Sequence, residues 1–168
     1  PTEVQIFPPV WWPETPRWQN FVDAWETAPF GRFYLNSVIV TCSGVVLEIL
    51  IASLSAYAFA RIRFRFREPL FIVMLAAMMI PGQVALIPNY VTLKHLGWIN
   101  TYAGLVVPHV SSVFGAFLMR QAILSMPADL FDAAHIDGLG HLRCMLRIAL
   151  PLARPVVATL ALYLFIAK

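Results

Sequence analysis

The chain has 168 residues, of which 60% are hydrophobic and only 12% are charged. A typical soluble domain is about half apolar and about one quarter charged, so the composition excludes a soluble globular enzyme as the starting class. Intrinsic disorder is excluded as well, because it needs a polar and charge-rich composition. The two cysteines, Cys42 and Cys144, lie far apart in the sequence and predict no disulfide framework. The composition favours an all-α helix bundle that crosses a membrane several times.

Residues 1–32 are polar and rich in proline and aromatic side chains, and they predict an outer segment that precedes the first span. They contain no basic start followed by a short apolar stretch, so no cleaved signal peptide is visible. The chain begins without methionine and ends at Lys168 inside an apolar pattern. We therefore expect the sequence to be a fragment of a longer protein, cut at both ends.

Four apolar runs predict four membrane-spanning helices, since a span takes about 20 apolar residues. The Gly, Ala and Ser residues of the first run suit close packing against other helices. Pro81 and Gly82 interrupt the second run near its end, so we expect a kink or a break there. The fourth run is short for a span. The predicted spans are residues 35–59, 70–87, 102–119 and 152–166.

Arginine and tryptophan positions predict one orientation in the membrane. Four arginines alternate with apolar residues in the segment 61–67, directly after the first span. Short loops rich in Lys and Arg stay in the cytoplasm, so this run indicates a membrane flank and no nucleic-acid partner. The segment 120–154 holds four more arginines and falls on the same side, whereas all five tryptophans fall on the outer side. We expect residues 1–32 outside and residues 120–151 inside.

The inward segment 120–151 predicts a helix–glycine–helix hairpin. Pro127 and Asp129 are typical of a helix start. Gly138 is a typical helix stop, where a left-handed backbone is needed. The apolar face of this first helix is predicted to contain Leu130, Phe131 and Ala134.

A second amphipathic helix is predicted to start near Gly140 or His141 and to be punctuated by Pro151. Periodicity alone leaves two interpretations of the hairpin open, a re-entry loop that lies on lipid headgroups and a specific interaction element. The predicted apolar face of the second helix contains Leu142, Met145, Leu146 and Ala149.

The hairpin contains the stretch DAAHIDGLGHLRCMLRIALP. It resembles the EAA loop of permease subunits in ATP-binding-cassette importers, which is Glu-Ala-Ala, three residues, Gly, nine residues and Ile-x-Leu-Pro. Asp132 takes the place of the Glu and keeps its charge. The residues at the matching positions are Ala133, Ala134, Gly138, Ile148, Leu150 and Pro151.

The resemblance implies a docking role for the first helix of the hairpin. It would sit in a groove on a separate ATPase, and the small Ala133 and Ala134 would permit a close approach. Asp132 and Asp137 would pair with basic groups of the ATPase, or with Arg143 within the loop.

Longer stretches resemble carbohydrate-importer permeases of the maltose and glycerol-phosphate type, and the maltose-G-like permease in particular. They are NSVIVT at Asn36, SAYAFARIRF at Ser55, IPNYVTLKHLGWINTYAGLVVP at Ile87 and FLMRQAILSMPADLFDAAHIDG at Phe117. The resemblance implies a type I importer permease of about six spans in the bacterial inner membrane. Its partners would be an ATPase dimer that uses the ATP, a second homologous permease, an extracytoplasmic solute-binding protein and membrane lipid. The solute would be a sugar, a polyol or glycerol phosphate.

The sequence contains none of the common motifs for nucleotide hydrolysis or metal binding. It has no GxxxxGK[ST] phosphate loop, no HExxH and no paired CxxC. We therefore expect no catalytic residue, no bound cofactor and no metal site, and we expect a transport subunit that is not itself an enzyme.

Several polar residues are predicted at membrane depth. Glu48 is near the centre of the first span, and an intramembrane acid is a functional-site candidate by default. The structural alternative is a buried acid that is protonated or paired with a neighbouring helix. His109, Ser111 and Ser112 could line a polar path, although hydrogen bonds between packed helices explain the serines equally well.

Two other classes of protein remain open at this point. An ion-coupled secondary transporter or channel would use Glu48 as its ion or proton site. A membrane enzyme ranks last, because no catalytic constellation occurs. The energy source separates the first two classes, since an importer permease needs a separate ATPase.

Overall fold

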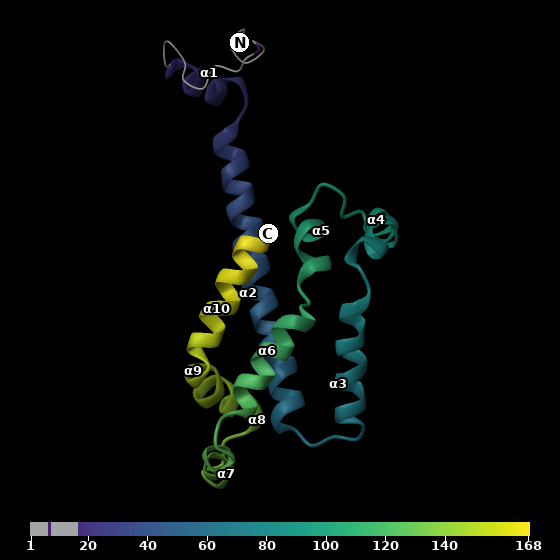
Figure 1. Cartoon of the computed structure of the whole chain (residues 1–168), viewed down its shortest axis with the longest axis vertical. Coiled ribbons are helices and arrows are strands. Elements are labelled where there is room, and N and C mark those ends of the chain that lie inside the picture. Colours follow the sequence, from purple (N-terminus) through teal and green to yellow (C-terminus); the bar gives the residue numbers. More distant parts are fainter. Residues whose placement is uncertain (1–6, 8–16) are drawn as a thin grey trace. The chain divides into compact units, whose positions relative to one another are not determined.

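The computed structural model describes Phe7 and residues 17–168, and every regular element in this part is helical (Figure 1). Trp11 and Trp12, which the sequence places outside, lie beyond the described residues. The element η5 is a π-helix, and the other η elements are 3-10 helices. In chain order the elements are α1 (Gln19–Thr27), α2 (Phe30–Arg61), α3 (Arg67–Ala76), η2 (Ala77–Met79), η3 (Gly82–Ala85), α4 (Leu86–His95), α5 (Tyr102–Val106), η4 (Val107–His109), α6 (Val113–Leu124), α7 (Ala128–Ile136), α8 (His141–Cys144), η5 (Met145–Ala149), α9 (Leu150–Leu152) and α10 (Arg154–Ala167).

The chain divides into two compact units, residues 1–37 and 38–168, with the boundary inside α2. In the first unit Trp25 of α1 stacks against Phe30 and Tyr34 of α2, with ring centroids 6.0 Å apart in both pairs. Helix α1 was not predicted from the sequence, and none of its residues is buried. The second unit contains every candidate functional residue.

Helix α2 alone is long and apolar enough to cross a membrane among the described helices. Its 32 residues give a length of about 48 Å, and it extends beyond the predicted span 35–59 at both ends. Each of three further helix pairs passes the same test only when joined across a bend. The described part of the chain thus has one candidate span, or up to four if each bent pair is one span.

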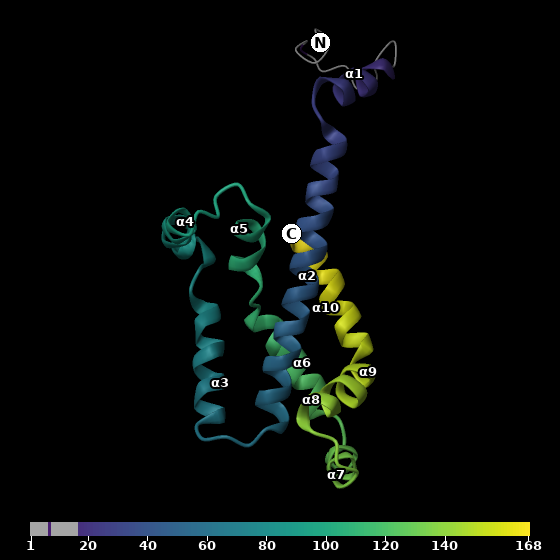
Figure 2. The same ribbon diagram turned by 180° about the vertical axis from the view of Figure 1, so that it is seen from behind.

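The three bends lie where the backbone hydrogen-bond ladder is interrupted. The segment from α3 to η2 meets the segment from η3 to α4 at 89°, which confirms the predicted break at Pro81 and Gly82. Figures 1 and 2 show α4 lying across the end of α3. The pair α5–η4 and α6 bends by 50° next to His109, and the pair α8–α9 and α10 bends by 81°.

Small residues let α2, α6 and α10 approach closely in the core of the second unit. Ala52 and Ala56 of α2 are 1% and 0% exposed. A Cβ added at Gly115 of α6 would lie 3.3 Å from Cβ of Ala52 and 3.3 Å from Cδ2 of Leu160. The predicted close packing of the first apolar run is confirmed, because its Ala52 faces the glycine of a neighbouring helix.

Arg120 of α6 holds one end of this bundle together. Its guanidinium donates to both carboxylate oxygens of Glu68 at 3.0 Å, and its Nε donates to the carbonyl of Phe59 at 3.2 Å. The same guanidinium lies 4.0 Å from the ring centroid of Phe71. These contacts join the end of α2, the start of α3 and the end of α6, so the arginine-rich segment 61–67 and the hairpin lie at the same end.

We expect this end to face the cytoplasm, and single-cysteine labelling checks it. The change Arg65→Cys is made in a background with Cys42→Ser and Cys144→Ala. An impermeant thiol reagent should label residue 65 only after the cells are opened, because the arginine-rich segment stays inside. A matched Trp98→Cys protein should be labelled from outside. Labelling of residue 65 in intact cells would reverse the proposed orientation.

Candidate functional site

Helix α7 is the first helix of the hairpin and has well-defined ends. Pro127 has φ −55° and ψ 134°, so it caps the helix from outside instead of entering its first turn as predicted. Gly138 has φ 81°, which confirms it as the helix stop. The amide of Gly138 donates to the carbonyl of His135 at 3.0 Å, and that of Leu139 donates to Ala134 at 2.9 Å. This pair of bonds is a Schellman motif, which needs a left-handed residue.

The predicted apolar face of α7 is confirmed at two of its three residues. Phe131 and Ala134 are buried in the core, with exposures of 3% and 6%. Leu130 is 45% exposed and Ile136 is 86% exposed, so Leu130 does not belong to the core face. The prediction that Ala134 permits close docking is corrected, because its methyl group packs inside the protein. Ala133, one residue earlier, is the exposed alanine.

The second half of the hairpin contains a π-helix, η5. The amide of Leu150 donates to the carbonyl of Met145, five residues earlier. Cys144, Met145 and Ala149 are buried, which confirms the predicted burial of Met145 and Ala149. The other two residues predicted on that face, Leu142 and Leu146, are 60% and 52% exposed, which corrects that part of the prediction.

Pro151 does not end this segment, contrary to the prediction. It lies in α9, and the chain turns two residues later at Ala153. Pro155 then lies in the first turn of α10, where a proline without an N–H is tolerated.

Arg61, the last residue of α2, attaches the hairpin to the bundle. Its guanidinium donates to the carbonyls of Ile123 and Met126, each at 2.7 Å, and so binds the last turn of α6 and the connection that follows it. It also lies 4.0 Å from the ring centroid of Phe131 on α7. The sequence showed Arg61 only as part of a basic run, because its carbonyl partners are 62 and 65 positions away.

The residues of the EAA-like pattern divide into a packed half and an exposed half. Ile148 and Leu150 pack against the hydrophobic core, and Pro151 is half-buried. The exposed half consists of Asp132, Ala133, Asp137 and Gly138, to which the structure adds Ile136.

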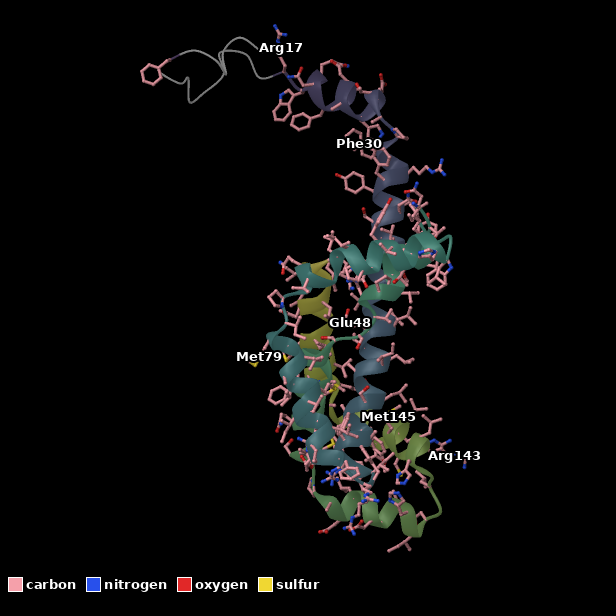
Figure 3. The ribbon with its side chains drawn as sticks, turned by 90° about the vertical axis from the view of Figure 1, so that its right-hand side faces the viewer. Arg17, Phe30, Glu48, Met79, Arg143 and Met145 are labelled. Carbon is pink, nitrogen blue, oxygen red and sulfur yellow. The ribbon has the colours of Figure 1, made fainter. Side chains whose placement is uncertain are left out.

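The predicted intramolecular pairing of the exposed aspartates with Arg143 does not occur. Within the described residues, neither Asp132 nor Asp137 forms an ion pair. Figure 3 shows Arg143 pointing away from the bundle. The exposed half therefore presents two carboxylates and an apolar side chain to the surroundings.

The membrane-depth residues predicted from the sequence line one cavity of about 540 Å³. Figure 3 shows Glu48 midway along the second unit. The cavity brings together Glu48, His109, Ser111 and Ser112, and its wall also includes Thr41, Tyr163 and Lys168.

Glu48 is buried and paired. One of its carboxylate oxygens lies 3.2 Å from Nζ of Lys168, the residue that directly follows α10. This geometry matches the structural alternative for Glu48, a buried acid paired with a neighbouring helix. Ser112 uses its hydroxyl to cap α6, accepting from the amide of Gly115 at 2.9 Å. Among residues 17–168, no three His, Cys, Asp or Glu side chains gather as metal ligands.

We expect Glu48→Gln to leave transport largely intact. The amide oxygen of glutamine still accepts a hydrogen bond from Lys168, and the shape of the side chain is kept. Glu48→Lys is the contrasting variant. It places a second ammonium group beside that of Lys168 at a buried position, and this repulsion should abolish uptake. Uptake is measured at matched membrane levels. Loss of uptake with Glu48→Gln at a normal membrane level would instead support an ion site.

The comparisons with known proteins agree with this helical membrane architecture. Residues 48–167 match the family described as binding-protein-dependent transport system inner membrane component. The chain is 36% identical over 156 residues to the diacetylchitobiose uptake system permease protein NgcG of Streptomyces coelicolor, a match that covers 92% of this chain and 52% of that protein. It is 40% identical over 135 residues to the sn-glycerol-3-phosphate transport system permease protein UgpE of Agrobacterium fabrum, with coverage of 80% and 48%.

A solved structure is similar as well. The chain superposes with a TM-score of 0.72 and 28% identity on a bacterial ABC transporter involved in the import of the acidic polysaccharide alginate, covering 80% of this chain and 47% of that one. The two curated relatives are permease components of transport systems, a class of subunit that is not itself enzymatic. The chain belongs to the family of inner membrane components of binding-protein-dependent transport systems, and it is a bacterial multi-pass membrane protein. It spans about half the length of the curated relatives that it matches.

Proposed function

We propose that the chain is part of a permease that carries a solute across the inner membrane, and that α7 docks on a separate ATPase. The observation that carries the proposal is the exposed half of the EAA-like pattern. Ala133, Ile136 and Asp137 face away from the core and end at the fixed turn of Gly138. An apolar side chain that is 86% exposed beside unpaired carboxylates suits a groove with basic groups at its rim.

The contacts of α7 give a route for movement from the ATPase to the membrane helices. Arg61 and Phe131 join α7 to the end of α2, and α2 carries Glu48 in the wall of the cavity. ATP that binds more tightly to the closed ATPase dimer would move the docked helix and shift the permease between inward-facing and outward-facing states. The residues of this chain supply the attachment and not the hydrolysis.

The proposed partners are those of a complete importer. They are an ATP-binding-cassette ATPase dimer, a second homologous permease and an extracytoplasmic solute-binding protein. The named relatives are permeases for diacetylchitobiose and glycerol 3-phosphate uptake, so we propose a sugar, polyol or glycerol phosphate as the solute class. The hydroxyl groups of Thr41, Ser112 and Tyr163 in the cavity wall suit a solute with hydroxyl groups.

The energy source tests this proposal. The complete complex is placed in liposomes with its solute-binding protein, and solute uptake is measured with and without internal ATP. Uptake should need ATP and should persist when ionophores remove every ion gradient. Uptake that needs the gradient and not ATP would favour the alternative, an ion-coupled transporter or channel that uses Glu48.

A further inference from the structure

A second cavity, of about 750 Å³, lies at the hairpin end of the bundle. Its wall is formed by the end of α2, the arginine-rich segment and α7. Three guanidinium groups face a single carboxylate, that of Asp132, so the cavity carries an excess of positive charge. Its charged and titratable wall residues are Arg61, Arg63, Arg67, Asp132, His135 and His141.

The arginines of this cavity are not fully used by the protein. Within the described residues, the side chain of Arg63 forms no ion pair, and Nε of Arg61 is buried without a hydrogen-bond partner. Arg67 is paired with Glu68 at 3.0 Å, but Arg120 shares that carboxylate. Guanidinium donors without acceptors, in a cavity with excess positive charge, suit an anion with several oxygens, and phosphate is the anion that arginine recognises best.

Apolar surface beside the cavity indicates where the anion comes from. Phe64 and Phe66 alternate with the arginines and are 39% and 59% exposed. The adjoining helix α3 exposes Leu70, Ile72 and Val73 by 50–66%. A ligand that fits both surfaces has a phosphate at one end and acyl chains at the other. A basic cavity at the cytoplasmic ends of membrane helices is a typical place for such headgroups.

We propose that this cavity binds the phosphate of an anionic phospholipid headgroup from the cytoplasmic leaflet, with Arg63 as its exposed contact. The proposal rests on the orientation proposed for this end and is independent of docking to the ATPase. The bound lipid would join the arginine-rich segment and α7 at the membrane surface. It would thereby add a membrane attachment to the hairpin beside that of Arg61.

The test uses the complete complex in phosphatidylcholine nanodiscs that contain a minor fraction of phosphatidylglycerol. Native mass spectrometry measures the phosphatidylglycerol that the complex retains. Arg63→Gln removes the cavity contact, and Arg65→Gln is the matched control, because it changes the same charge in the same segment but lies outside the cavity. Loss of one charge-assisted contact should lower retention with Arg63→Gln about tenfold below that with Arg65→Gln. Arg63→Lys keeps the charge and should restore part of the retention.

Two outcomes would overturn the proposal. Equal losses with Arg63→Gln and Arg65→Gln would show attraction by overall surface charge, without a defined cavity site. Soluble glycerol 3-phosphate serves as the second probe. Its binding in lipid-free detergent, with the same dependence on Arg63 and with displacement of phosphatidylglycerol, would identify a free phosphate ester and not a lipid as the ligand. ATP hydrolysis, measured in parallel, keeps a failed lipid site distinct from a failed importer.

Discussion

Gly138→Val should leave the protein inserted in the membrane but weaken its hold on the ATPase. Gly138 has φ 81°, a backbone conformation that strongly penalises a β-branched residue. The cost is local, about 1–3 kcal/mol, which is too small to expel a multi-span protein from the bilayer. It is enough to lower the fraction of hairpins in the docking geometry about fivefold or more. Co-purification of the ATPase and its hydrolysis rate, stimulated by the solute-binding protein, are the two measurements.

Gly140→Val is the matched control for this prediction. A Cβ added at Gly138 or at Gly140 meets nothing within 4 Å, so neither substitution causes a clash. Gly140 has φ −74° and ψ 162°, which valine adopts without strain. The two variants therefore differ in the sign of the backbone angle φ at the substituted residue. If Gly138→Val retains the ATPase as well as Gly140→Val does, the fixed turn has no part in docking.

Substitution of arginine for either of two adjacent alanines, Ala133 and Ala134, should prevent docking to the ATPase, but for two different reasons. Ala133 is exposed on α7, so Ala133→Arg should leave the hairpin folded and prevent close docking. Ala134 is 6% exposed in the core, so Ala134→Arg places an unpaired charge among Phe131 and its neighbours. That burial should cost on the order of 3–5 kcal/mol and detach the hairpin from the bundle.

Proteolysis of the hairpin separates these two failures, and ATPase co-purification is measured beside it. Ala133→Arg should resist the protease like the unmodified chain and still lose the ATPase. Ala134→Arg should be cut faster and lose the ATPase as well. Full co-purification and full stimulated hydrolysis with Ala133→Arg would leave the hairpin as a surface loop, and the importer proposal would lose its main structural support.

Local signals in the sequence were sufficient to predict the class of protein and the places where its helices break or end. The apolar runs indicated a helical membrane protein, and the EAA-like spacing indicated its family. The break at Pro81 and Gly82 and the left-handed stop at Gly138 were predicted correctly, because each depends on the backbone chemistry of one or two residues.

The faces of the hairpin helices were predicted only in part. In α7, Phe131 and Ala134 are buried as the periodicity predicted, but Leu130 is exposed, because the neighbours that cover the helix decide where its buried face ends. The π-helix η5 inserts one residue into the turn, and no local signal in the sequence marks that insertion. The buried face of this half includes Cys144 beside Met145, and Leu142 and Leu146 lie on the exposed side.

The long-range polar contacts were decided by the tertiary structure alone. The sequence singled out Glu48 and Arg61 because charged residues are conspicuous in or beside an apolar run. It could not show that Glu48 pairs with Lys168, or that Arg61 binds carbonyls at the end of α6 and just after it. A backbone carbonyl is present at every residue, so its identity as a partner depends only on where the folded chain brings it.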